Sequence, residues 1–249
     1  MPYLSNTMKP PKPHKGFLLG LAVALTAAFV LCTAASDSGV VVYNTASAVD
    51  GFGADYRHVY SGLHLKEMGL SEKAFELAIK GWTKLKAKGR VSKDIISICD
   101  FTKSSNQKRL YIIDLASGTL LFNTLVAHGK NTGEEFAHYF SNNPSSLQSS
   151  LGFYLTKEAY TGSHGLGLKL AGVEPGFNDR AEERAIVMHG ASYVCDDFIS
   201  QYGRLGKSWG CPAVPFELHE QIINTIKDGT CLFIYYPDKA YLAASHLLN

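Results

Sequence analysis

Short apolar runs that end in turn residues are the feature that most constrains how this chain can fold. They begin with IISICDF (residues 95–101) and RLYIIDL (109–115) and end with CLFIYY (231–236). Apolar runs of about four to eight residues bounded by glycine, serine or charged turns are typical of buried β-strands. The chain lacks the regular alternation of strand and helix that indicates a parallel sheet. We therefore predict a mainly β (α+β) domain, a β-sandwich or open barrel with a few flanking helices.

Two helices are expected beside the strands. Ser71 can cap a helix whose apolar side chains recur at helical spacing as far as Leu85. Pro215 is expected to open a second helix at its first turn, and Gly229 to end it. Residues 238–249 are expected to form a loose tail.

The first 35 residues differ from the rest of the chain. A basic, proline-rich start is followed by an almost wholly apolar stretch, residues 16–32, and by small residues before Ser36. This order is typical of an export signal, although an apolar stretch of about 17 residues is also near the lower limit for an uncleaved membrane anchor. The predicted organisation is a signal peptide or N-terminal anchor over residues 1–35, a flexible linker over 36–62 and one folded domain over 63–249.

Charge argues against a nucleic-acid partner. The chain has 24 basic and 22 acidic residues, and removal of Lys9, Lys12 and Lys15 with the signal leaves 21 basic against 22 acidic. A net charge of −1 gives no basic surface for nucleic acid. Metal binding is not expected either, because paired ligands at zinc spacing are missing around His128 and His138.

His189 and Cys211 are the strongest candidates for chemistry. An apolar run leads into His189, and Cys211 stands between Gly210 and Pro212 in SWGCP. A thiol with a reference pKa of about 8.5 is mostly protonated at neutral pH, and a neighbouring imidazole can take its proton. Because Pro212 has no N–H, the donors for a developing oxyanion must come from Cys211 and the residues before it, so the Gly210 amide is a candidate.

Two questions about this pair stay open at the level of the residues. The imidazole can be oriented by the backbone carbonyl of Gly190 or by a carboxylate, Asp196 or Asp197. The mature part also holds an even number of cysteines, so Cys211 can instead belong to a structural disulfide, for example with Cys195.

The same residues carry a resemblance. HG followed by SWGCPAVP resembles the histidine and cysteine motifs of the murein L,D-transpeptidase (YkuD-like) catalytic domain family, and the similarity extends upstream through FSNNPSSLQSSLGFYLT, YTGSHGLGLKLAG and EPGFNDRAEERAIVMHGA. It covers about residues 110–215. The general family pattern has an arginine two residues after the cysteine, where this chain has Ala213.

The resemblance implies an exported enzyme of the bacterial periplasm or cell envelope that works without a cofactor. Its cysteine is acylated by a peptidoglycan stem peptide at the bond before D-alanine, and an amine acceptor then takes the acyl group. It assigns the nucleophile to Cys211, the base to His189, the orienting carbonyl to Gly190 and an oxyanion amide to Gly210. The candidates for substrate binding are Ser208, Trp209, Arg184, Arg204, Asn178 and His164.

Three alternatives remain beside this interpretation. Water can replace the amine, which gives an L,D-carboxypeptidase, and a disulfide at Cys211 would give a non-catalytic peptidoglycan-binding module. A papain-like peptidase is disfavoured because such enzymes place cysteine before histidine in the chain. The acceptor, the oligomeric state and the effect of Ala213 do not follow from the sequence.

Overall fold

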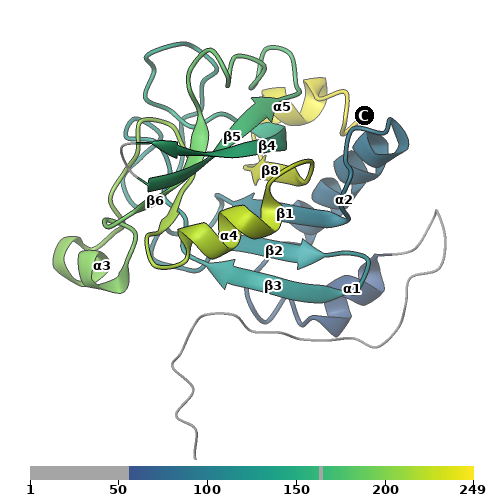
Figure 1. The fold of residues 1–249 in the computed structure, drawn as a ribbon, viewed down its shortest axis with the longest axis horizontal. Helices are drawn as coiled ribbons and strands as arrows, with labels where there is room; N and C mark the ends of the chain where they lie inside the picture. The colour runs from purple at the N-terminus through teal and green to yellow at the C-terminus, as the bar shows by residue number, and fades with distance from the viewer. Residues whose placement is uncertain (1–55, 163–164) are drawn as a thin grey trace, which may run out of the picture. The chain divides into compact units, whose positions relative to one another are not determined.

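Eight strands form one mixed sheet in the computed structural model, which describes residues 56–162 and 165–249. Their order is β3-β2-β1-β8-β4-β5-β6-β7, and Ala127, just after β3, forms an isolated bridge with Ala213 of β7. The two edges of the sheet therefore meet, and the sheet is nearly closed like a barrel (Figure 1). This confirms the mainly β prediction. The strands are β1 (Ile95–Asp100), β2 (Leu110–Asp114), β3 (Thr119–Thr124), β4 (Gly152–Gly162), β5 (Gly165–Gly172), β6 (Val187–Ala191), β7 (Ala213–Pro215) and β8 (Cys231–Tyr235).

Five helices accompany the sheet in the described part of the chain. The longest, α2, follows the predicted cap, because the Ser71 side chain accepts a hydrogen bond from the Ala74 amide at 3.3 Å. It packs on β1 and β8, and a Cβ at Gly81 would lie 2.0 Å from Phe153. Only glycine permits this close approach between helix and sheet. The helices are α1 (Arg57–Gly62), α2 (Glu72–Ala87), α3 (Asp196–Tyr202), α4 (His219–Ile226) and α5 (Lys239–Ala244).

The predicted linker ends too late in the sequence. Residues 57–62 form α1, in which Val59 is fully buried and Tyr60 donates a hydrogen bond to the Leu70 carbonyl at 2.7 Å. The burial of these two side chains attaches the segment to the domain. The signal or anchor segment and residues 36–55 lie outside the described residues. None of the described helices has the length and apolar character needed to cross a membrane.

The end of the chain is also more ordered than predicted. Strand β8 lies inside the sheet, parallel to β1 and antiparallel to β4. The predicted loose tail forms α5, where Asp238 caps the Tyr241 amide and the Tyr241 side chain is fully buried, and Leu247, after the helix, is also fully buried. Pro215 ends β7 and does not open a helix; α4 begins four residues later, at His219. Its Ile222, Ile223 and Ile226 side chains are buried.

A buried carboxylate holds α5 to the sheet. Glu174 is 1% exposed and accepts hydrogen bonds from the Phe153 amide at 2.8 Å, from the Tyr241 hydroxyl at 2.7 Å and from the Ser245 hydroxyl. Glu174→Ala leaves these three donors without an acceptor, so we expect a loss of about 3 kcal/mol in the free energy of unfolding. Urea denaturation measures it. Tyr241→Phe removes one donor and keeps the ring, so it should cost clearly less; equal costs would contradict this role.

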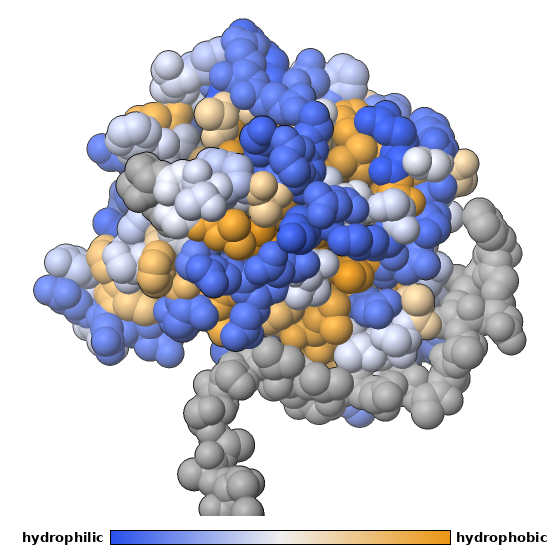
Figure 2. All heavy atoms as spheres, in the orientation of Figure 1, coloured by the Kyte–Doolittle hydropathy of each residue, from blue (hydrophilic) through white to orange (hydrophobic). Residues whose placement is uncertain are grey.

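Apolar side chains on the face drawn in Figure 2 occur in separate areas among hydrophilic ones. Most large apolar residues of the described part of the chain are enclosed between the sheet and the helices, and the large apolar side chains left exposed there are aromatic. They are Phe136, Tyr139, Tyr160, Tyr202, Trp209 and Phe216.

Candidate active site

Cys211 lies on the turn that leads into β7, with its sulfur against the segment before β6. The Val187 amide donates to Sγ at 3.5 Å, and the thiol faces the Ala185 carbonyl at 3.8 Å. Ala185 has a left-handed φ of 52°, which costs energy for a residue with a Cβ and is common at functional sites. All four cysteines within the described residues are free thiols. The structure therefore contains no disulfide at Cys211.

His189 lies on β6, directly beside β7, the strand that follows Cys211. Strands β6 and β7 are parallel, and His189 is aligned with Ala213. Continuing this register by two residues brings Cys211 level with Val187, which agrees with their hydrogen bond. Strand spacing and rise then give a separation of about 8 Å between the Cα atoms of His189 and Cys211. This separation allows a cysteine and a histidine side chain to meet.

The imidazole of His189 is oriented by the backbone. Nδ1 lies 3.0 Å from the Gly190 carbonyl oxygen, and a carbonyl accepts only from a protonated nitrogen. The proton therefore resides on Nδ1, and Nε2 is the basic nitrogen. Of the two orienting groups considered from the sequence, the Gly190 carbonyl makes this contact, whereas Asp196 and Asp197 form the first turn of α3.

The pKa of the Cys211 thiol reflects opposing influences. Burial raises it, while the hydrogen bond from the Val187 amide and the positive charge of Arg184 lower it. Burial is the largest of the three, so the pKa of the thiol is raised above its ordinary value. A thiolate then requires transfer of the proton to a base such as His189.

The turn before Cys211 is built by Ser208. Its hydroxyl donates to the Cys211 carbonyl at 2.6 Å and accepts from the Gly210 amide at 3.1 Å. Ser208 is 4% exposed, so it shapes the turn and does not form a substrate surface. The Gly210 amide, predicted as an oxyanion donor, is thus engaged inside the turn. The hydrogen bonds of the described residues assign no acceptor to the Cys211 amide.

The other predicted binding residues are distributed unevenly. Trp209, 78% exposed, lies two residues before Cys211, while Arg204 pairs with Glu134 at 2.9 Å. The prediction for Asn178 is wrong, because its side chain is fully buried. Its Oδ1 accepts a hydrogen bond from the Glu174 backbone amide, and its Nδ2 donates to the Phe153 carbonyl. Asn178 is a polar residue in a charged, turn-like segment, and nothing in the sequence indicates that its side chain is buried. His164 lies outside the described residues.

Two site residues were not found from the sequence. A Cβ at Gly190 would lie 2.5 Å from Cγ of His219, so the His219 ring packs against the peptide that orients His189. Ser149 donates from its hydroxyl to the Gly210 carbonyl at 3.3 Å. Both are long-range contacts, and neither residue stands in a motif of its own. No cluster of three or more metal-ligating side chains occurs within residues 56–162 and 165–249.

A buried pair, Arg109 and His128, lies next to residues 208–211, which we call the cysteine turn. Arg109 is fully buried and donates to His128 Nδ1 at 2.9 Å, so His128 Nε2 donates to the Gly133 carbonyl at 3.2 Å. The next residue, Gly129, packs so closely on Gly210 that a Cβ there would lie 2.9 Å from its Cα. The HG dipeptide at His128 was visible in the sequence, and its role is structural.

The neutral His128 makes stability depend on pH. Burial and the charge of Arg109 lower the pKa of His128 to about 3. The unfolded chain takes up this proton near pH 6.5, so the unfolded state binds more protons between about pH 3 and 6.5 and stability falls as the pH falls through this range. From pH 7.5 to 5 the wild type should lose about 2 kcal/mol more than His128→Asn, measured by urea unfolding. Equal losses in the two proteins would contradict this assignment.

Comparison with known proteins identifies the family. Residues 66–235 match the family described as L,D-transpeptidase catalytic domain. The chain belongs to this family of cell-wall enzymes, whose members act on peptidoglycan stem peptides. No curated protein sequence matches the chain.

Several solved structures are similar to parts of the chain. The L,D-transpeptidase from Xylanimonas cellulosilytica is 16% identical, with 59% of this chain and 62% of that chain covered and a TM-score of 0.33. The L,D-transpeptidase from Mycobacterium smegmatis is 9% identical, with coverages of 58% and 60% and a TM-score of 0.35. The helical cell shape determining protein Pgp2 from Campylobacter jejuni is 17% identical, with coverages of 59% and 49% and a TM-score of 0.40. The match thus spans less than two thirds of each of these chains.

Proposed function

We propose that this protein is a peptidoglycan L,D-transpeptidase that works through a cysteine acyl-enzyme. The observation that carries the proposal is the position of a free Cys211 on the turn that leads into β7, next to the parallel strand β6 that carries His189, whose imidazole is held by the Gly190 carbonyl. Such an arrangement supplies a nucleophile, a base and an orienting group.

In the first half-reaction, Nε2 of His189 removes the proton from Cys211 Sγ. The thiolate attacks the carbonyl carbon between the L-centre of the third stem residue and D-alanine, and the carbonyl oxygen becomes an oxyanion. The Cys211 amide is the nearest unassigned donor for that charge, and the Gly210 amide can join it by leaving the Ser208 hydroxyl. When the C–N bond breaks, His189 returns the proton to the D-alanine amine, and a thioester remains on Cys211.

In the second half-reaction, an amine attacks the thioester and gives its proton to His189. The new amide leaves, and the thiol of Cys211 is restored. Water in place of the amine gives the L,D-carboxypeptidase reaction at the same site. Trp209, exposed beside the nucleophile, is the side chain best placed to contact the incoming stem peptide. We place the enzyme outside the cytoplasmic membrane, in the cell envelope, because its substrate is there and its N-terminal segment is typical of an export signal.

The proposal is tested with a muropeptide that carries a tetrapeptide stem, incubated with and without a second muropeptide as amine acceptor. Mass analysis should show loss of D-alanine, joined to a cross-linked product when the acceptor amine is present. Loss of D-alanine with only the free tripeptide as product would favour the carboxypeptidase. An unchanged tetrapeptide would contradict both activities.

A further inference from the structure

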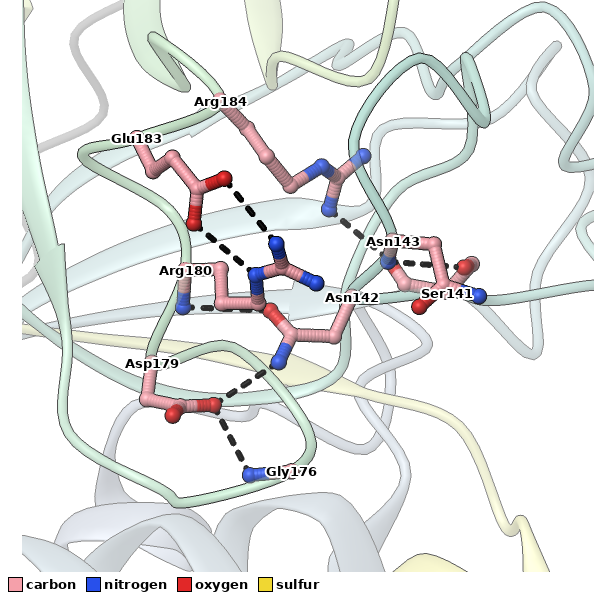
Figure 3. Close-up of polar contacts among 8 residues, drawn as sticks. All are labelled: Ser141, Asn142, Asn143, Gly176, Asp179, Arg180, Glu183 and Arg184. Carbon is pink, nitrogen blue, oxygen red and sulfur yellow. Dashed lines mark hydrogen bonds and ion pairs between the residues drawn. The ribbon is translucent and has the colours of Figure 1, made fainter.

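Arg184 is tied to one loop of the domain through nearly all of its donors. Its Nη1 donates to the Ser141 carbonyl at 2.7 Å and to the Ser150 hydroxyl, and its Nη2 donates to the Ser146 hydroxyl at 3.1 Å and the Gln148 carbonyl at 2.7 Å. We call residues 141–150 the serine loop. Figure 3 shows the Arg184 guanidinium directed at Ser141. The two outer nitrogens use all four of their N–H groups here, so the fork that binds a carboxylate is already occupied.

The serine loop lies directly under the cysteine turn. Ser149 joins the two through its hydroxyl, which donates to the Gly210 carbonyl at 3.3 Å and accepts from the Gly129 amide at 3.0 Å. A Cβ at Gly210 would lie 2.8 Å from the Gln148 oxygen and 3.3 Å from Arg184 Nη2. The guanidinium therefore stands behind the residue that precedes the nucleophile.

The charge of Arg184 is not neutralised by a nearby carboxylate. Its four acceptors are carbonyl and hydroxyl oxygens, and no salt bridge within the described residues includes it. Burial lowers the pKa of the guanidinium, and its charge in turn lowers the pKa of Cys211. A half-buried cation next to a thiol stabilises the thiolate.

We propose that Arg184 is a positioning residue for Cys211: it fastens the serine loop beneath the cysteine turn and places a positive charge behind the nucleophile, and it does not bind a substrate carboxylate. The inference rests on the proposed function in that Cys211 is taken as the nucleophile. It replaces the role of substrate ligand that the sequence suggested for this arginine.

Few other titratable groups affect the ionisation of Cys211. Tyr154 and Tyr193 interact with it electrostatically, and burial raises the pKa of both, that of Tyr193 to about 12. They stay neutral where the thiol titrates. His189, the base of the proposed mechanism, is unchanged in all the variants below. A change in the pH profile between variants therefore reports on Arg184.

The experiment follows alkylation of Cys211 by iodoacetamide as a function of pH in the folded protein. Cys211→Ala identifies the signal that belongs to this thiol. Arg184→Gln should slow alkylation at pH 7 by roughly tenfold and move the profile to higher pH. Arg184→Lys keeps the charge but lacks the planar fork, so it should keep the wild-type profile. In both variants, hydrogen exchange of the serine-loop amides should become faster.

Arg180 provides a matched control on the same segment. Its guanidinium pairs with Glu183 at 2.9 Å on the surface, as Figure 3 shows, and only its backbone amide contacts the serine loop, at Asn142. Arg180→Gln should leave both measurements unchanged. A wild-type alkylation profile in Arg184→Gln, a profile shifted from the wild type in Arg184→Lys, or unchanged exchange in the serine loop would overturn the proposal. If Arg184→Gln does not fold, the alkylation profile and the serine-loop exchange of Arg184→Lys still test the proposal.

These results do not depend on turnover of a muropeptide. Alkylation and exchange are measured on the free protein, so they test Arg184 even if the tetrapeptide stem is not the substrate. If Arg184 bound a substrate carboxylate, Arg184→Gln would instead raise KM for the tetrapeptide and leave the alkylation profile unchanged.

Discussion

Cys211→Ala is expected to abolish release of D-alanine from a tetrapeptide muropeptide, with a fall of about a thousandfold or more. In the proposed mechanism the sulfur of Cys211 becomes acylated, and alanine has no nucleophile to replace it. Release of D-alanine is measured by mass analysis. The unfolding midpoint serves as the control for folding.

Only a small change in stability should accompany this loss of activity. The sulfur makes two weak contacts, to the Val187 amide and the Ala185 carbonyl. Retained D-alanine release by a folded Cys211→Ala protein would show that another residue attacks the stem peptide.

Gly190→Ala should have the second largest effect, because it disturbs the group that orients His189. The new methyl would lie 2.5 Å from Cγ of His219, closer than real Cβ contacts, and the neighbouring backbone must move. Overpacking of this kind costs about 1–3 kcal/mol. A displaced Gly190 carbonyl no longer holds Nδ1 of His189, so kcat should fall by about a hundredfold.

A double variant distinguishes this mechanism from general damage. Gly190→Ala combined with His219→Ala opens the space that the methyl needs and should recover about tenfold of the lost activity. His219→Ala alone provides the reference for the cavity it creates. The kinetics are read from D-alanine release, with unfolding midpoints for all three variants. No recovery in the double variant would contradict the steric explanation.

Local signals in the sequence predicted most of the fold. The Ser71 cap and the apolar runs that form β1, β2 and β8 depend on neighbouring residues, and the structure has all of them. Pro215 was misplaced because a proline fits both the end of an edge strand and the first turn of a helix. The order of α5 was missed because it depends on Glu174, a partner 67 residues from Tyr241.

The candidate site likewise has features that local sequence motifs predict and features that depend on distant residues. The HG and SWGCP motifs marked His189 and Cys211 as candidates, and the register of β6 and β7 aligns His189 with Ala213, two residues after Cys211. The sequence does not show that Ser208 engages the Gly210 amide, or that Arg184 binds the serine loop 34 to 43 residues before it. Such partners depend on how the loops meet in the folded domain, and this is decided by tertiary packing.

The central claim is that the sulfur of Cys211 forms a thioester with the stem peptide. It is tested by acid quenching of the protein with a tetrapeptide muropeptide, followed by intact-mass analysis and mapping of the modified peptide. We predict an adduct with the mass of the substrate less D-alanine, located on Cys211 and removed by an added amine. An adduct at another residue, or release of D-alanine by a protein whose Cys211 has been fully alkylated, would contradict the claim.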